Sequence, residues 1–252
     1  SSTTGHYAEF DNVSLKEVTF DQPDGTLTLF EHPENVPRVE WDSAGNRLGL
    51  LVEEQRTNNY QYSEDFNNSY YNVKIRTRTL EATQTGPDGL TSAYVFGDDS
   101  SGGTDNILLG KSSVSLVINT TYTWSVFAKK DGLNWLSLSC VDFGGVANGY
   151  THFDLENGAV GSTQNNITAK IQEYPDGWYR CSVTFTTNGT DATGNLYMYL
   201  AEADGDRIVD LDGTSSILIY GAQLEAGSFP TSYIKNEGTS SGVTRSADVA
   251  KI

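Results

Sequence analysis

The sequence predicts an all-β protein, an antiparallel jelly-roll-like β-sandwich with irregular N- and C-terminal flanks. The composition favours strands and turns, because glycine (25 residues) suits left-handed turns and tyrosine (14 residues) suits a pleated surface. Short segments of alternating apolar and polar residues recur at roughly even spacing, separated by clusters of glycine, asparagine and aspartate. No segment shows the apolar spacing of an amphipathic helix. Together these patterns favour a sandwich.

The chain divides into three regions. Residues 1–47 form a turn-rich lead-in with one plausible strand at 7–18, which is also a candidate for the end of a preceding module. Residues 48–226 hold the regular pattern and are expected to form the sandwich. Residues 227–252 return to a polar composition and are expected to form an extended C-terminal tail. The side chains expected to dock this tail are Phe229, Tyr233 and Ile234.

The expected strands follow one another with turn signals between them. The turns contain pairs such as Asp-Gly and Asn-Gly, whose residues tolerate the backbone conformations that turns require. Within each strand, apolar residues at every second position indicate one buried face. The expected strands within the sandwich are 48–53, 59–66, 71–83, 92–97, 106–117, 122–130, 133–143, 149–156, 169–187, 194–203 and 215–225.

The first of these segments is expected to deliver the chain into the sandwich. Leu50 and Val52 are expected to be buried, since they alternate along an apolar strand. Arg56 is expected to pair with a neighbouring glutamate, and Asn58 and Asn59 are expected to turn the backbone.

The overall charge excludes two classes of partner. Asp and Glu number 33 and Lys and Arg number 16, so the formal net charge is −17. Such a surface repels phosphate backbones and anionic lipids, so neither nucleic acid nor a membrane surface is an expected partner. No apolar run reaches the roughly 18 residues that a membrane span needs, which predicts no membrane insertion. No signal peptide is recognisable.

Both cysteines are expected to point into the core. Alternation places Cys140 on the same face as Leu136 and Leu138, and Cys181 on the same face as Val183. One interpretation is two small buried hydrophobic residues. The other is a disulfide between facing strands. Two cysteines in a chain of this length do not make a disulfide scaffold.

Catalytic motifs are incomplete, so the sequence predicts that the chain is not an enzyme. Glycosidases need two carboxylates that face each other across the bond, and the acidic pairs at 9–11 and 40–42 are better explained as surface residues. Of the three histidines, only His152 lies in a clear strand, where it could serve a polysaccharide lyase as a base. The serine-hydrolase motif G-x-S-x-G is absent, and no cysteine or histidine pair has zinc-ligand spacing.

One acidic stretch is a candidate calcium site. Residues 202–213 place four aspartates around two glycines, and calcium prefers closely spaced oxygen ligands. The alternative is a solvated acidic loop. The candidate ligands of a structural Ca²⁺ ion are Asp204, Asp206, Asp210 and Asp212.

Aromatic residues beside polar residues indicate a sugar-binding face. Sugars bind where flat aromatic faces stack on the ring and nearby polar groups fix the hydroxyls. In segment 194–203, Leu196, Met198 and Leu200 are expected to face inward, which leaves the tyrosines between them outward. The same reasoning applies to four further strands. The predicted binding residues are Phe127, Trp135, Tyr150, His152, Trp178, Arg180, Tyr197 and Tyr199.

Two alternatives to this face stay open. The outward aromatics could form a second layer that the tail or a partner subunit covers. Binding could instead use the loops at the edge of the sandwich, at 142–149 and 202–213.

Several long motifs resemble a known family. The chain over about residues 35–248 resembles a module of phage and prophage virion proteins such as tail fibres. It also resembles the jelly-roll carbohydrate-binding modules of the families numbered four, nine and twenty-two, which close with a strand like FDNVSLKE (10–17). The motifs that carry the resemblance are LGLLVEEQRTNNYQYSEDF (48–66), YTWSVFAKK (122–130), FDLENGAVGS (153–162), DGWYRCSVTF (176–185), IYGAQLEAGSFPTSYI (219–234) and VTRSAD (243–248).

The resemblance implies a function and a location. It implies non-catalytic binding of a polysaccharide or cell-surface glycan by a virion or secreted surface protein, and therefore a virion or extracellular location. The main alternative is a structural or assembly module of a tail fibre that binds no sugar. Such a module would form a homo-oligomer as part of a larger fibre. A polysaccharide-degrading enzyme is the third alternative.

Overall fold

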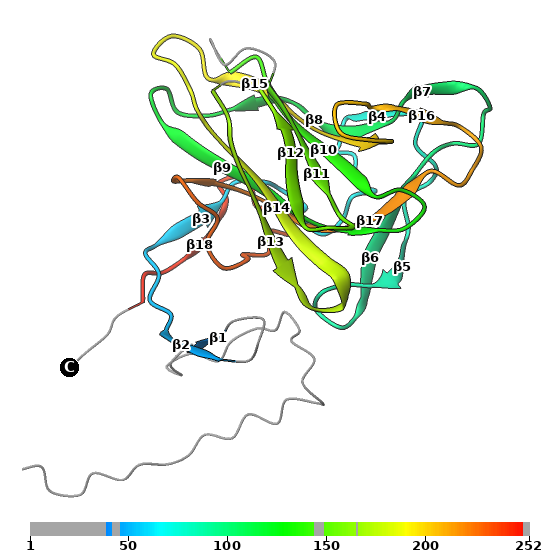
Figure 1. The fold of residues 1–252 in the computed structure, drawn as a ribbon. Helices are drawn as coiled ribbons and strands as arrows, with labels where there is room; N and C mark the ends of the chain where they lie inside the picture. Colours follow the sequence, from blue (N-terminus) through cyan, green and yellow to red (C-terminus); the bar gives the residue numbers. More distant parts are fainter. Residues whose placement is uncertain (1–38, 42–45, 144–148, 165, 249–252) are drawn as a thin grey trace, which may run out of the picture.

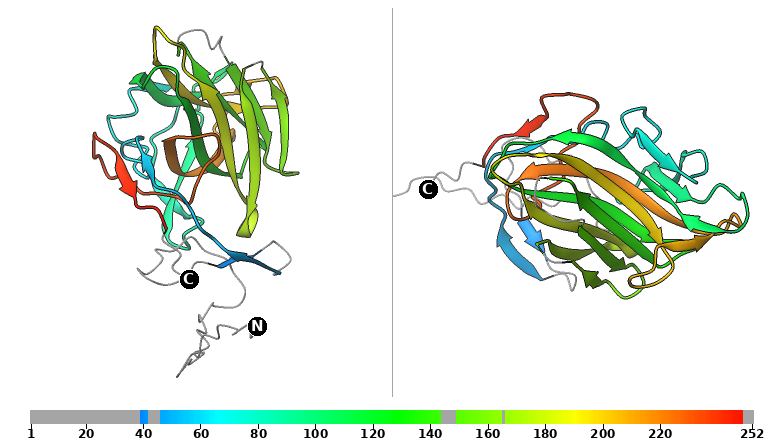
Figure 2. Two further views of the ribbon diagram at one scale, coloured as in Figure 1. Left: turned by 90° about the vertical axis from the view of Figure 1, so that its left-hand side faces the viewer. Right: turned by 90° about the horizontal axis from the view of Figure 1, so that it is seen from above.

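The protein is a β-sandwich in the computed structural model, which describes residues 39–41, 46–143, 149–164 and 166–248. Within these ranges the chain forms strands, and the one helical element is the short 3-10 turn η1 (Pro175–Gly177). Two six-stranded antiparallel sheets stack as two layers in a jelly-roll-like arrangement (Figures 1 and 2). The predicted fold class is confirmed. No helix in the described part is long and apolar enough to span a membrane.

We call the first of the two sheets sheet I. Its strand order is β12-β11-β10-β15-β8-β4. The central strand β10 pairs with β11 on one side and with β15 on the other. Its strands are β4 (Val73–Ile75), β8 (Leu108–Ser115), β10 (Trp135–Val141), β11 (Gly149–Asp154), β12 (Ala159–Thr163) and β15 (Thr193–Ala201).

The second sheet, sheet II, has the strand order β13-β14-β9-β17-β6-β5. Its central strands β9 and β17 are the longest in the sheet and pair with each other. Its strands are β5 (Ala82–Thr85), β6 (Thr91–Gly97), β9 (Thr121–Lys130), β13 (Thr168–Tyr174), β14 (Trp178–Thr186) and β17 (Ser216–Ala226).

In the described part of the chain, three two-stranded ribbons lie outside these sheets. The ribbon of β3 and β18 brings together two segments that lie far apart in the sequence, and the ribbon of β7 and β16 lies at the other side of the sandwich in Figure 1. The pairs are β1 (Val39–Trp41) with β2 (Arg47–Leu50), β3 (Arg56–Asn58) with β18 (Val243–Arg245), and β7 (Thr104–Asn106) with β16 (Ile208–Asp210).

The core lies between the two sheets and follows the alternation in the sequence. Leu196, Met198 and Leu200 of β15 are fully buried there, as predicted. Cys140 on β10 and Cys181 on β14 are also fully buried, and both are free thiols. Because β10 and β14 belong to different sheets, the two cysteines extend into the core from opposite layers.

The entry into the sandwich differs from the prediction in two respects. Segment 59–66 forms turns and bends rather than a strand. Leu50 and Val52 are each 53% exposed, because they precede the two sheets and belong to β2 and the link that follows it. The expected pairing of Arg56 is confirmed, since its guanidinium contacts Glu54 at 2.5 Å. The candidate strand at 7–18 lies outside the described residues.

Asn58 joins three separate parts of the fold. Its side chain is fully buried, and its Oδ1 accepts hydrogen bonds from the backbone N–H groups of Tyr60 (2.9 Å) and Leu224 (3.0 Å). The bond to Tyr60 turns the backbone, as the sequence predicted. Its Nδ2 donates to the carbonyl of Ile234 at 2.7 Å. One side chain thus ties the entry strand β3 to β17 and to the residues after β17.

Residues 227–248, which we call the C-terminal segment, dock on sheet II. Ile234 is buried, and the Tyr233 hydroxyl hydrogen-bonds Ser63 Oγ at 2.8 Å. Phe229 is different from the expectation, since half of it is exposed and it lies under the Arg56 guanidinium, 5.4 Å from the ring centroid. Of the three expected anchors, Ile234 is therefore buried, Tyr233 is partly buried and Phe229 is half exposed.

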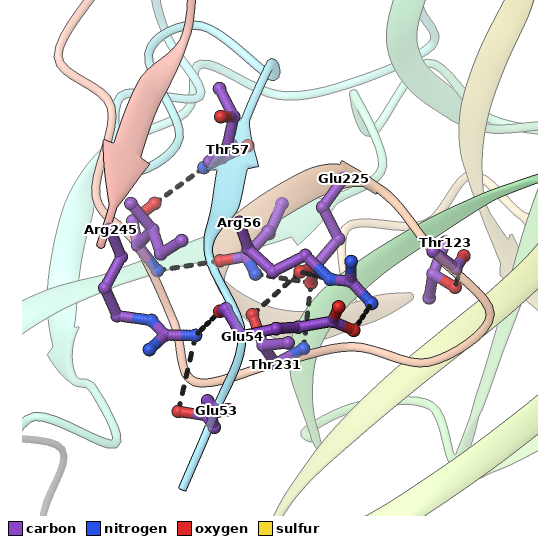
Figure 3. A network of polar contacts seen from close by, with 12 residues as sticks. Glu53, Glu54, Arg56, Thr57, Thr123, Glu225, Thr231 and Arg245 are labelled. Carbon is purple, nitrogen blue, oxygen red and sulfur yellow. Dashed lines mark hydrogen bonds and ion pairs between the residues drawn. The ribbon is translucent and has the colours of Figure 1, made fainter. Parts of the chain in front are cut away.

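A buried carboxylate holds the start of this segment (Figure 3). Glu225 is fully buried and accepts hydrogen bonds from the backbone N–H (2.9 Å) and the hydroxyl (2.7 Å) of Thr231. The Gln223 amide donates to it at 2.6 Å, and Arg56 forms an ion pair with it at 3.6 Å. A buried charge needs such partners, so the network fixes how the segment leaves β17.

Candidate functional site

The predicted sugar-binding residues divide between two opposite outer faces of the sandwich. Trp135, Tyr150, His152, Tyr197 and Tyr199 lie on strands of sheet I. The other three, Phe127, Trp178 and Arg180, lie on strands of sheet II. Alternation predicts that a side chain points away from the core, but it does not say from which sheet. The expectation of one shared face is therefore wrong.

The outer face of sheet II is closed. Phe127 and Trp178 are buried in a second hydrophobic cluster with Leu218 and Tyr220, and Tyr233 of the C-terminal segment packs against it. The rings of Phe127 and Tyr233 meet edge to face, with 5.9 Å between their centroids. This arrangement matches the alternative in which the tail covers a second layer.

Arg180 also connects sheet II to the C-terminal segment. Its side chain is buried, and its Nε and Nη2 donate to Ser125 Oγ at 3.2 and 3.1 Å. Its Nη1 donates to the carbonyl of Thr231 at 2.5 Å, which ties β14 to the C-terminal segment. Phe127, Trp178 and Arg180 are thus buried, and the prediction that they face solvent is wrong.

The outer face of sheet I carries aromatic residues on both sides of its central strand. In the register, Ser139 of β10 lies between Tyr150 of β11 and Tyr197 of β15. Ser137 lies in the same way between His152 and Tyr199. Small hydroxyl residues on the middle strand leave room for the rings on either side. We call this set of residues the tyrosine face: Ser137, Ser139, Tyr150, His152, Tyr197 and Tyr199.

Two pairs of tyrosine rings contact each other, one across β10 and one along β15. Tyr150 and Tyr199 meet edge to face with 6.0 Å between their centroids, and Tyr197 and Tyr199 do so at 6.4 Å. Tyr150 and Tyr197 stay partly exposed, whereas Tyr199 is 9% exposed. The face therefore offers partly solvent-exposed rings that neighbouring rings hold in place.

The loop after β15 folds back over this face. Asp204 Oδ1 accepts a hydrogen bond from the backbone N–H of Ser162 on β12, which fixes the loop to the edge strand of sheet I. The Arg207 guanidinium then lies over two rings, 3.6 Å from the centroid of Tyr150 and 4.4 Å from that of Tyr199. Cation–π contacts of this kind hold the arginine above the tyrosines.

A pocket opens between this loop and the tyrosine face. Its volume is 210 Å³, small for a complete oligosaccharide and suited to one substituent or part of one sugar. Alternation identified two of its lining residues and missed the rest, because loop folding depends on long-range contacts such as that of Asp204. The pocket is lined by Tyr150, His152, Ser162, Gln164, Gly205 and Arg207.

Polar atoms beneath the rings lack partners in the described part of the chain. The hydroxyl oxygens of Ser137 and Ser139 are buried and form no hydrogen bond. Buried polar groups in folded proteins are usually hydrogen-bonded, so such a cluster is typical of a place where water or a ligand supplies the partner. Burial lowers the pKa of His152, so its ring is neutral near pH 7.

Trp135 lies at the border of the tyrosine face. Its indole packs against Gly161 of β12, where a Cβ atom would meet the ring at 2.8 Å and Asp204 Oδ1 at 2.5 Å. Glycine at this position thus allows the tryptophan and the Asp204 loop to approach β12 together. Trp135 is partly exposed and extends the aromatic surface toward the sheet edge.

Three of the four candidate calcium ligands accept hydrogen bonds from separate partners. Besides Asp204, Asp206 accepts from the backbone N–H of Ile208, and Asp212 accepts from the backbone N–H and hydroxyl of Thr214. Asp210 lies in the ribbon strand β16. Among the described residues, no group of three His, Cys, Asp or Glu side chains could hold a metal ion. Of the alternative binding loop 142–149, residues 144–148 lie outside the described residues.

Comparisons with known proteins give only distant similarity. No family model and no curated protein matches the chain. The apo structure of BiXyn10A CBM1 is 10% identical over 70% of this chain and 99% of that chain, with a TM-score of 0.34. The CBM22-1-GH10 modules of the Clostridium thermocellum N-terminal endo-1,4-beta-D-xylanase 10B, complexed with xylohexaose, are 16% identical over 73% of this chain, with a TM-score of 0.38. This chain covers 30% of that xylanase chain. Similarity at this level assigns no function.

Proposed function

We propose that this protein binds a polysaccharide or cell-surface glycan through the tyrosine face and performs no chemistry on it. The observation that carries the proposal is the contrast between the two outer faces. The aromatic face of sheet II is closed by the C-terminal segment, while that of sheet I presents partly exposed rings beside buried polar atoms that lack partners. Stacking rings beside hydrogen-bonding groups are what sugar rings and their hydroxyls require.

The pocket lining supports a binding role rather than catalysis. Glycoside hydrolysis by the usual route needs two carboxylic acids on either side of the bond. The residues that line the pocket include no Asp or Glu.

The cellular setting belongs to the same proposal. The sequence motifs that resemble virion tail-fibre modules support a glycan receptor on a virion or another extracellular surface. An acidic chain with a net charge of −17 is a poor ligand for nucleic acid or anionic lipid, which leaves a glycan as the favoured partner.

An assembly module of a fibre is a second candidate function. It is favoured by three apolar side chains at every second position beside the sandwich, Leu48, Leu50 and Val52, which are 63%, 53% and 53% exposed. Exposed apolar residues in a row suit a contact with another protein segment. In that case the chain would form an oligomer and would bind no sugar.

One pair of assays on the whole chain tests the proposal. A glycan array reports binding, and assays for reducing and unsaturated ends report cleavage of every glycan that binds. We expect retention of at least one glycan class and no release of new ends. Oligomer formation without binding to any glycan would favour the assembly module, and release of new ends would show an enzyme.

A further inference from the structure

Arg207 is the one arginine or lysine among the residues that line the pocket. Its guanidinium lies over the faces of Tyr150 and Tyr199, and it is only partly exposed. Two aromatic contacts restrict its movement, so the group is already positioned before any ligand arrives.

The charge of Arg207 is not used by a carboxylate of the described part of the chain. No ion pair joins it to Asp or Glu there, whereas Arg56, Arg76, Arg78 and Arg245 all form such pairs. The acids nearest in sequence accept backbone hydrogen bonds, Asp204 from Ser162 and Asp206 from Ile208. In a chain with 33 acidic residues, an arginine that is positioned by rings and left without an acidic partner points to a ligand that brings one.

We infer that the pocket binds the carboxylate of an acidic sugar, a uronate, with Arg207 as the group that recognises it. This inference rests on the proposed glycan binding and names the class of glycan. A guanidinium offers a planar pair of N–H donors that matches a carboxylate, and such charge-assisted pairs are stronger than neutral hydrogen bonds. Ser162 and Gln164 line the same pocket and supply polar groups for neighbouring hydroxyls.

The net charge of −17 acts against a polyanion, because the whole surface repels it at long range. Recognition of a uronate therefore depends on short-range contact with Arg207 rather than on attraction to the protein as a whole. Removing this one charge is expected to remove the preference for acidic sugars, while removal of a remote positive charge is not.

Matched polymers test the inference directly. Binding of the whole chain is measured at about pH 7 to polygalacturonate, polyguluronate and polyglucuronate, each against its methyl ester, and to a panel of neutral glycans. The ester keeps the sugar and removes the charge. We expect at least one acid form to bind about tenfold or more tightly than its ester, which is the strength of one charge-assisted contact.

Three variants complete the test, with melting temperatures recorded for each. Arg207→Gln is expected to bring the ratio of acid to ester affinity close to one, and Arg207→Lys is expected to keep part of the ratio. The matched control is Arg76→Gln, which removes the same charge from a surface arginine paired with Asp99 and Asp105. It is expected to leave the ratio unchanged.

The outcomes separate the inference from the proposed function. Equal binding of acid and ester, or binding of neutral glycans only, overturns the inference and leaves glycan binding intact. Binding to none of the polymers overturns both. A charge preference that survives in Arg207→Gln also overturns the inference, because another group would then recognise the carboxylate.

Discussion

His152 is a neutral histidine beneath the tyrosine face. Burial is the largest cause of its lowered pKa, and the positive charge of Arg207 acts in the same direction. A backbone hydrogen bond with Ser162 and the carboxylates of Asp204 and Asp206 oppose it. The pKa of this residue in the folded chain therefore lies below the value of 6.5 expected for an unfolded histidine.

The shift predicts a stability change with pH. Because the folded pKa is the lower one, the unfolded chain binds the proton first, and the contribution of His152 to stability is complete above pH 6.5 and is lost as pH falls toward the folded pKa. Calorimetry between about pH 7 and pH 5 should show a steeper fall in melting temperature for the parent than for His152→Gln. Equal slopes would mean that His152 is not perturbed in the folded chain.

Cys140 and Cys181 are predicted to be inert in the folded protein. Both are fully buried free thiols, and burial raises the pKa of each, so neither forms the reactive thiolate. A thiol reagent should therefore label the native chain far more slowly than the chain in denaturant. Unfolding should make two thiols available for labelling. Labelling at the same rate in both states would contradict the burial of these residues.

At the scale of elements, the sequence predicts well which side of a strand each residue faces. It predicts less well which sheet each strand joins. The inward side chains of β15 follow from alternation alone, because side chains in a strand point to opposite faces in turn. The choice of sheet does not follow from it, since β9 and β10 are adjacent in the chain and belong to different sheets. For this reason Phe127 was grouped with residues that lie on the opposite side of the molecule.

The sequence also predicts the structure of loops poorly. Residues 202–213 read as an acidic, metal-binding stretch, because their composition is all that a sequence displays. Their structure shows that Asp204 fixes the loop to β12 and that Arg207 reaches two tyrosines. Neither contact has a local signal, which is why Arg207, Ser162 and Gln164 were missed.

The network around Glu225 makes a prediction about the C-terminal segment. Glu225→Ala leaves Arg56 and Thr231 without their buried partner, and losing one member of a buried ion pair costs about 3–5 kcal/mol of unfolding free energy. The matched control is Glu156→Ala, which removes an exposed ion pair with Lys130 and should cost about 0–1 kcal/mol. Urea unfolding measures both values. Equal losses would mean that the network does not hold the segment.

The whole molecule has two outer faces that differ in exposure. The face of sheet II is covered by the chain itself, and its aromatics are buried. The face of sheet I is partly open, and Trp135, Tyr150 and Tyr197 on it stay partly exposed. Outward-facing aromatic residues therefore fall into two groups. Substitution on sheet II is expected to lower stability, and substitution on sheet I is expected to lower the affinity for a ligand.

One pair of variants, Tyr197→Ala and Phe127→Ala, tests this division most directly. For each variant, calorimetry measures the affinity for a glycan and the melting temperature. Tyr197→Ala is expected to keep the melting temperature of the parent and to bind roughly tenfold more weakly, since one stacking contact of about 1–1.5 kcal/mol is lost. Phe127→Ala is expected to lose about 3–5 kcal/mol of stability and to keep its affinity wherever it is folded. Undiminished binding by Tyr197→Ala, with weakened binding by folded Phe127→Ala, would contradict the division between the two faces.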